Sequence, residues 1–249
     1  VAYSWGGANL RPGDAVLVTG MEHHANIVPW QMACERAGAT LKVLPVTDAG
    51  ELDLAALPAL LTPEVRLFAF VHVSNALGTV NPARELCALA RERGVLTLVD
   101  GSQAAPHLPV DVQAIGCDFY AITGHKMCGP TGTGALWGRP ELLAAMPPFM
   151  GGGEMIREVA FEGTTFADPP HRFEAGTPNI AGLIGLGAAA GYLAGIGMAA
   201  IADRERALAA HARERLAAVP GLRLVGAEAV DRVPVFSFVL DGAQAQDVA

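Results

Sequence analysis

The stretch Ala121–Trp137, AITGHKMCGPTGTGALW, places Lys126 between an apolar segment and a run of glycines, a pattern typical of a buried strand that ends in a tight turn. Lysine is rare in this chain: among 17 basic residues, the only lysines are Lys42 and Lys126. A desolvated lysine can lose its proton and attack a carbonyl, whereas arginine stays charged. The position therefore favours an imine-forming amine over the ordinary alternative, a surface lysine in a turn.

Outward from this stretch, short apolar runs alternate with helical patterns. Fully apolar strands that alternate with helices indicate an α/β fold with a mainly parallel sheet, covered by helices on both faces. The expected strands are 15–18, 41–46, 66–73, 95–99, 118–122 and 134–137, and the expected helices are 27–37, 54–61 and 82–93.

The last hundred residues have a different pattern. Residues 151–178 are rich in Gly, Pro and Thr and predict a long functional loop rather than a packed element. An amphipathic helix at 199–218 and strands at 222–225 and 233–240 predict the start of a smaller C-terminal α/β domain. We therefore expect a large domain over 1–195 and a truncated small domain over 196–249.

Composition excludes several classes of function. A net charge of −8 and the lack of a Lys/Arg run argue against nucleic-acid binding. The four cysteines form no zinc spacing or disulfide framework, which favours the cytoplasm. Residues 180–202 carry no charge and are long enough to span a bilayer, but their many glycines favour a buried helix of a soluble domain. Both ends are abrupt, so we expect a fragment that lacks both termini.

Polar side chains follow four of the expected strands, where ligands bind in open α/β sheets. These residues are Glu22, His23 and His24; Ser74 and Asn75; Asp100, Ser102 and Gln103; and Thr123, His125 and Lys126. Pyridoxal phosphate needs a lysine for its aldehyde and an acid for its ring nitrogen. Lys126 and Asp100 can supply these groups, although an Asp at this position is commonly a helix cap.

The neighbouring residues have competing interpretations. His23 is a candidate catalytic residue that can present an aromatic face to a cofactor ring and a nitrogen for proton transfer. The alternatives are a pair of loop histidines with His24 or a metal site; adjacent histidines point apart, and we expect no metal site. Thr123 and His125 can bind phosphate oxygens. The glycines of 129–134 lack the GK[ST] ending of a phosphate loop and predict a tight turn beside the lysine.

Five motifs together resemble the pyridoxal-phosphate-dependent cysteine desulfurases of the class V aminotransferase group, fold type I, and more narrowly their SufS-type branch. In order they are MEHHANIVPWQ (21–31), HVSNALGT (72–79), VDGSQA (99–104), DFYAITGHKMCGPTG (118–132) and RFEAGTPN (172–179). The resemblance runs along nearly the whole chain. It implies a seven-stranded-type sheet and a homodimer with shared sites.

The resemblance also implies a role for each matching residue. Lys126 would be the Schiff-base lysine and would move protons on the substrate. His23 would stack on the cofactor ring, Asp100 would pair with the ring nitrogen, and Gln103 would contact its phenolic oxygen. The remaining implied contacts are the phosphate ligands Thr123 and His125, the substrate-carboxylate ligand Asn75, and Thr177, which would reach the partner subunit's phosphate site.

The implied reaction converts L-cysteine, or L-selenocysteine in lyase-like members, to alanine. A mobile cysteine takes the sulfur as a persulfide and passes it to an acceptor protein for iron–sulfur cluster assembly. None of Cys34, Cys87, Cys117 and Cys128 has the family's sequence context for that nucleophile, so we expect it beyond residue 249. The rival interpretations are a related aminotransferase, hydrolase or epimerase, a non-catalytic cofactor-binding protein, and a nucleotide-binding domain.

Overall fold

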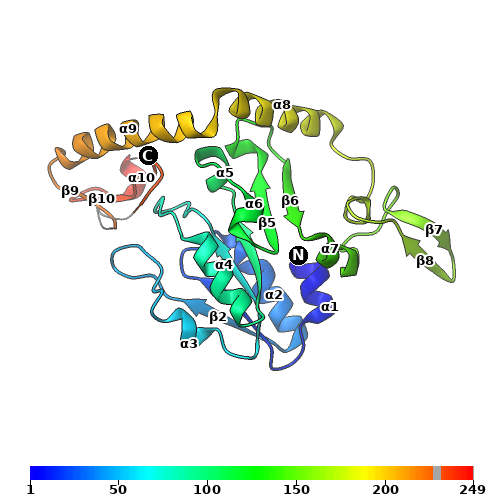
Figure 1. Cartoon of the computed structure of the whole chain (residues 1–249). Helices are drawn as coiled ribbons and strands as arrows, with labels where there is room; N and C mark the ends of the chain where they lie inside the picture. Colours follow the sequence, from blue (N-terminus) through cyan, green and yellow to red (C-terminus); the bar gives the residue numbers. More distant parts are fainter. Residues whose placement is uncertain (227–230, 249) are drawn as a thin grey trace.

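The computed structural model describes residues 1–226 and 231–248. Its centre is a six-stranded sheet in the order β2-β1-β3-β4-β5-β6 (Figure 1). The strands are β1 (Ala15–Thr19), β2 (Thr40–Leu44), β3 (Val65–Val71), β4 (Leu96–Asp100), β5 (Phe119–Thr123) and β6 (Gly134–Gly138). The first five are parallel and β6 is antiparallel to β5. The α/β class and the mainly parallel sheet are confirmed, with six strands in the described residues where seven were expected.

Helices cover both faces of this sheet because its central strands are apolar on both sides. In β3, Phe68 and Phe70 join the core under α4 (Ala83–Glu92), while Leu67 and Ala69 join the core under α2 (Val28–Ala37). Successive strand residues point to opposite faces, so one strand contributes to both cores. The sequence therefore has no hydrophobic–polar alternation at these strands.

Short helical turns connect the main elements. They are η1 (Ala2–Gly6), α1 (Gly7–Asn9), η2 (His24–Asn26), α3 (Leu57–Leu60), α5 (Ala104–His107), α6 (Val112–Ile115), η3 (Gly124–Lys126), α7 (Pro140–Ala145) and η4 (His171–Phe173). Two of them, η2 and η3, lie directly after parallel strands and carry residues of the expected site.

The glycine run after Lys126 forms the tight turn that the sequence predicts. The backbone N–H of Gly124 donates to the carbonyl of Thr133 at 2.8 Å, and that of Gly129 donates to the carbonyl of Gly124 at 2.9 Å. The segment 124–133 is too short for the crossover that a parallel strand requires. This is why β6 returns antiparallel.

The segment 151–178 was expected to be a loop without packed elements, and this is only partly correct. It contains an antiparallel hairpin of β7 (Ile156–Ala160) and β8 (Gly163–Phe166). The hairpin projects away from the central sheet (Figure 1). All its strand residues are exposed, so nothing in the described chain buries it.

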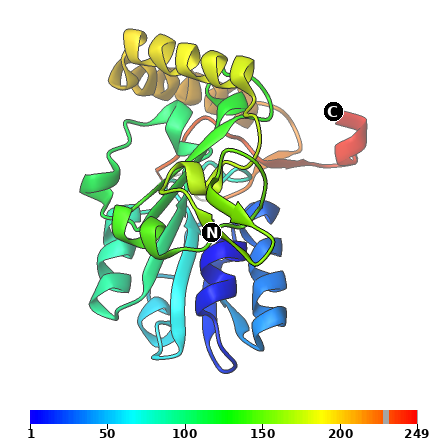
Figure 2. The same cartoon turned by 90° about the vertical axis from the view of Figure 1, so that its right-hand side faces the viewer.

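The uncharged stretch 180–202 does not form the single buried helix that was expected. It forms α8 (Ile180–Ile196) and the start of α9 (Met198–Ala217), with a bend of 75° between them. In α8 only Gly182, Ala189 and Leu193 are buried, because the helix touches the rest of the chain along one narrow side (Figure 2). No single described helix meets the length and hydropathy needed to cross a membrane; only the bent pair α8–α9 does so jointly.

The end of the chain forms β9 (Leu222–Leu224), β10 (Phe238–Leu240) and α10 (Ala245–Val248), with β9 and β10 antiparallel. The strand expected at 233–240 begins only at Phe238. The preceding segment, 231–237, instead docks on the turn that follows β3: Val80 N–H donates to Asp231 O at 2.9 Å, and Val233 N–H donates to Gly78 O at 3.0 Å. The division into domains at 195/196 stays a prediction.

Candidate active site

Four neighbouring strands bring the expected site residues to one edge of the sheet. In the order β1-β3-β4-β5, their carboxyl ends lead to His23, Asn75, Asp100 and Lys126. Backbone hydrogen bonds tie these ends together, from His72 N–H to Asp100 O at 2.9 Å and from Gly101 N–H to Ala121 O at 2.8 Å. The convergence predicted from the sequence therefore has a physical basis in the strand order.

Lys126 lies in η3 and is half-buried. Among the described residues its amine takes part in no hydrogen bond or ion pair, whereas Lys42, the other lysine, is paired with Glu64 at 2.7 Å. Before it, Gly124 lies so close to Thr133 that a Cβ would come within 2.2 Å of the Thr133 hydroxyl oxygen. The turn thus fixes the backbone of the lysine and leaves its amine free to react.

Thr123 and His125 flank the same turn. Thr123 ends β5, and its hydroxyl lies 3.0 Å from Nδ1 of His125. The exposed imidazole and the hydroxyl form one polar pair beside Lys126. This pair can donate hydrogen bonds to an anionic group such as a phosphate.

Asp100 is the last residue of β4 and is 9% exposed. Its Oδ1 accepts a hydrogen bond from Ser102 N–H at 2.9 Å, while its other oxygen accepts none from the described residues. Asp100 therefore does not cap a helix, because the N-cap of α5 (Ala104–His107) is Gln103; one of its oxygens instead closes the turn after β4. Gln103 follows at the start of α5, half-buried.

His23 is exposed and lies at the start of η2. Its Nδ1 accepts a hydrogen bond from Ala25 N–H at 3.1 Å. The ring of His24 is 5.8 Å away and tilted by 41°. The exposed face of His23 is free for the stacking role that the sequence suggests.

Glu22 is the main residue whose part in the site sequence reasoning missed, although its position after β1 was noted. The side chain is 9% exposed and accepts hydrogen bonds from Thr19, Asn26 and the backbone of Val71. Burial, with a smaller contribution from the nearby charge of Asp100, raises the pKa of Glu22 to about 7, although its hydrogen bonds act in the opposite direction. The sequence signal was a carboxylate between an apolar strand and two histidines.

His72 and Tyr120 form a second buried polar pair, which the sequence did not reveal. Nδ1 of His72 lies 2.9 Å from the Tyr120 hydroxyl, with the two rings edge to face. Burial lowers the pKa of His72 to about 4 and raises that of Tyr120. The Tyr120 ring also fills the space beside Gly101, where a Cβ would lie 2.0 Å from it. Tyr120, held by His72, thus packs against the turn that follows Asp100.

Two expected residues lie apart from these contacts. Asn75 is half-buried in the turn after β3, which is closed by a hydrogen bond from Gly78 N–H to Ser74 O at 2.9 Å. Thr177 is exposed in the segment between η4 and α8. No described contact joins Thr177 to the strand ends, and its expected place in a partner subunit's site stays a prediction.

The cysteines behave as the sequence suggests for core thiols. Cys34, Cys87 and Cys117 are buried, and burial raises the pKa of Cys87 to about 11 and of Cys117 to about 12. Cys128 is exposed, with a φ of 62° in the turn after Lys126. Among residues 1–226 and 231–248, no group of three or more His, Cys, Asp or Glu side chains could hold a metal ion.

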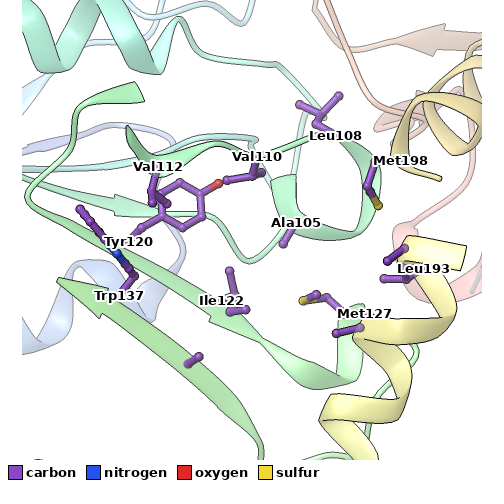
Figure 3. Close-up of a pocket in the computed structure, with 13 residues that line it drawn as sticks. Ala105, Leu108, Val110, Val112, Tyr120, Ile122, Met127, Trp137, Leu193 and Met198 are labelled. Atoms are coloured by element: carbon purple, nitrogen blue, oxygen red, sulfur yellow. The ribbon is translucent and has the colours of Figure 1, made fainter. Parts of the chain in front are cut away.

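A separate cavity of about 340 Å³ lies between α5, the β5–β6 pair and the α8–α9 bend. Figure 3 shows Met127, Leu193 and Met198 around it, with the Tyr120 hydroxyl among otherwise apolar side chains. Such a lining does not suit a phosphate-bearing cofactor. The strand-end edge is therefore the candidate active site.

The chain is similar to known proteins along its whole length. A probable cysteine desulfurase of Xylella fastidiosa is 59% identical over 249 residues, which make up 100% of this chain and 60% of that protein. The crystal structure of the Escherichia coli cysteine desulfurase CsdA matches with a TM-score of 0.95 and 40% identity, over 99% of this chain and 61% of that one. The chain therefore spans only part of the length of these relatives.

A more distant match is C-DES, a cystine C–S lyase solved in complex with its product, cysteine persulfide. It has a TM-score of 0.80 and 29% identity, over 94% of this chain and 63% of that one. A variant of C-DES has been solved with glycine covalently linked to its PLP cofactor. The family model described as aminotransferase class-V matches residues 1–249 in full, and the chain belongs to that family.

Proposed function

We propose that this chain is the pyridoxal-phosphate-binding part of a cysteine desulfurase of the SufS type. The complete protein would convert L-cysteine to L-alanine and pass the sulfur, as a persulfide, to an acceptor protein for iron–sulfur cluster assembly. The observation that carries the proposal is Lys126, whose amine has no partner in the described part of the chain and which follows the strand next to the one that ends in Asp100. Cysteine desulfurases match the chain along its whole length.

The residues present fit the cofactor by their chemistry. The amine of Lys126 has no competing partner among the described residues, and one oxygen of Asp100 is uncommitted. Thr123 and His125 offer donors for a phosphate beside the amine. The set thus contains a nucleophile, a counter-ion for a ring nitrogen and an anion site.

Each residue then has a task of its own. Pyridoxal phosphate, when bound, supplies an aldehyde that takes up amines and a ring that accepts electron density. Lys126 would hold the aldehyde and, once displaced by the substrate amine, carry a proton to or from the substrate carbon. Asp100 would keep a proton on the ring nitrogen. The other proposed contacts are His23 on the ring face, Gln103 on the phenolic oxygen, Thr123, His125 and the partner-directed Thr177 on phosphate, and Asn75 on the substrate carboxylate.

The sulfur-accepting thiol is proposed to lie outside these 249 residues. Three of the four cysteines are buried with raised pKa values, so they contain little thiolate at neutral pH. Cys128 is held in the turn that positions Lys126. We further propose a cytoplasmic homodimer, and L-selenocysteine as a second substrate.

The test uses the complete protein with added pyridoxal phosphate. We expect a visible absorption band from lysine-bound cofactor, release of alanine from L-cysteine, and loss of both in Lys126→Ala. Lys42→Ala is the matched control and should keep both. A folded protein that stays colourless with the cofactor would contradict the proposal.

One alternative has an observation in its favour. C-DES is similar in structure to this chain and is a cystine C–S lyase. Product analysis separates the two reactions, because a desulfurase leaves alanine from cysteine. A lyase acting on cystine releases cysteine persulfide, as that structure contains.

A further inference from the structure

Glu22 joins three segments of the candidate site through a single buried carboxyl group. Its Oε1 accepts hydrogen bonds from the Thr19 hydroxyl at the end of β1 and from Val71 N–H at the end of β3, the latter at 2.9 Å. Its Oε2 accepts from Nδ2 of Asn26, in η2, at 2.6 Å. Three donors thus converge on two acceptor oxygens.

The network continues away from the site into α2. Oδ1 of Asn26 accepts a hydrogen bond from Nε1 of Trp30 at 3.2 Å. Thr19, Glu22, Asn26 and Trp30 are all at most 9% exposed. Because Trp30 can only donate, it fixes which end of the Asn26 amide faces Glu22.

His23 has no comparable support of its own. Its ring is exposed, and its one hydrogen bond to the described residues is to Ala25 N–H within the same turn. The place of that ring relative to the strand ends is therefore set by whatever fixes the turn. Glu22, the preceding residue, makes the contacts that do so.

We propose that Glu22 is a positioning residue that holds the His23 turn over the cofactor site by accepting hydrogen bonds from β1, β3 and η2 together. The inference rests on the proposed function, since it takes His23 as the residue that stacks on the cofactor. The charge of Asp100 also acts on this carboxyl, so the group lies close to the site electrostatically as well as through its hydrogen bonds.

A swap of donor and acceptor tests the geometry directly. In Glu22→Gln, an amide N–H₂ must face a donor, either Asn26 or the pair Thr19 and Val71. In Asn26→Asp, two carboxyl oxygens face each other. In the double variant the new amide donates to the new carboxylate, and Trp30 keeps an acceptor. The two single changes should therefore compensate each other.

The experiment measures pyridoxal 5'-phosphate binding by the complete apoprotein, through absorbance titration and the visible circular dichroism of the bound cofactor. We expect each single variant to weaken binding by about tenfold and to reduce the dichroism, because a buried hydrogen-bonding group is left unsatisfied. The double variant should return to within about threefold of the wild type. The matched control is Glu35→Gln, at an exposed position of α2, which should bind as the wild type does.

Several outcomes would overturn the inference. If Glu22→Gln unfolds more easily but binds the cofactor with unchanged affinity and dichroism, Glu22 only stabilises the fold. If the single variants do not fold, the double variant is the test. A double variant that folds and binds the cofactor as the wild type does supports the inference. One that folds but binds the cofactor tenfold more weakly overturns it. A wild-type protein that does not bind the cofactor would overturn the proposed function itself, before any variant is compared.

Discussion

Glycine serves different purposes at the strand-end edge and in the later part of α8, from Gly187 onward. At the edge, Gly101 and Gly124 lie where a Cβ would come within about 2 Å of Tyr120 and Thr133. In α8, Gly187, Gly191 and Gly195 have no atom within 4 Å of where a Cβ would lie. The edge uses glycine to bring elements into contact, and so does the start of α8, where a Cβ on Gly182 or Gly185 would lie within 2.8 Å of Thr133 or Pro130. The three later glycines of α8 bring no element into contact. The number of glycines in a segment therefore does not indicate how tightly that segment packs.

The largest effect is expected from Gly101→Ala. The added methyl group would lie 2.0 Å from the Tyr120 ring, which is itself held by His72, so neither side can move easily. We expect a loss of at least about 3 kcal/mol in the free energy of unfolding, measured by denaturant titration. A loss below about 1 kcal/mol would show that the edge is not rigid.

The second prediction concerns pH. Because the pKa of Glu22 in the folded protein is raised to about 7 from 4.5, the folded state binds the proton more tightly than the unfolded state. The stability that this proton contributes is present below about pH 4.5 and is lost as pH rises through 7, by roughly 3 kcal/mol in total.

Denaturant titrations of the apoprotein between pH 5 and 8 measure this slope. Glu22→Gln should make stability less dependent on pH in this range, because its amide does not titrate. An unchanged slope in this variant would assign the effect to another group. Substitutions in α8 should leave the slope as it is.

A smaller effect of opposite sign is expected from Gly187→Ala. This position lies within α8 and has open space around it, so only helix propensity changes. Alanine should raise the free energy of unfolding by about 1 kcal/mol, seen as a higher denaturation midpoint. A decrease instead would mean that another chain packs closely against this side of α8.

The smallest effect is expected from Ile184→Ser. Ile184 is 70% exposed, so the described chain loses little contact when it is shortened. Its stability should stay within about 0.5 kcal/mol of the wild type in the same titration. A larger loss would place Ile184 in an interface, and analytical ultracentrifugation would show whether that interface joins two copies.

Much of the sheet was predictable because its strands are short, apolar and bounded by turn residues. Phe68 and Phe70 are examples, since both lie in an uninterrupted apolar run that predicts a strand buried on both faces. The direction of β6 was not assigned from the sequence, because it depends on the length of the connection. The β7–β8 hairpin was missed because its residues are exposed, so no burial pattern marks it.

The site was predictable to a similar degree. The strand ends that carry His23, Asp100 and Lys126 follow from the positions of the apolar runs. The contacts of Glu22 do not, because one of its donors is a backbone N–H of Val71, distant in sequence. The burial of α8 was wrongly predicted, because it too depends on contacts between segments distant in sequence. Hydropathy indicates what a helix can bury, and tertiary structure decides what it does bury.

After the central sheet, the chain returns to the strand-end edge at two places. The first contact is made by α9, where Oε1 of Glu205 lies 2.8 Å from Nδ1 of His107 in α5. Helix α5 begins directly after Gln103. The second contact is made by segment 231–237, which forms backbone hydrogen bonds with the turn that holds Asn75. α9 has 20 residues and spans about 30 Å. The chain that follows the sheet thus contacts both the segment of a proposed cofactor contact, Gln103, and the segment of a proposed substrate contact, Asn75.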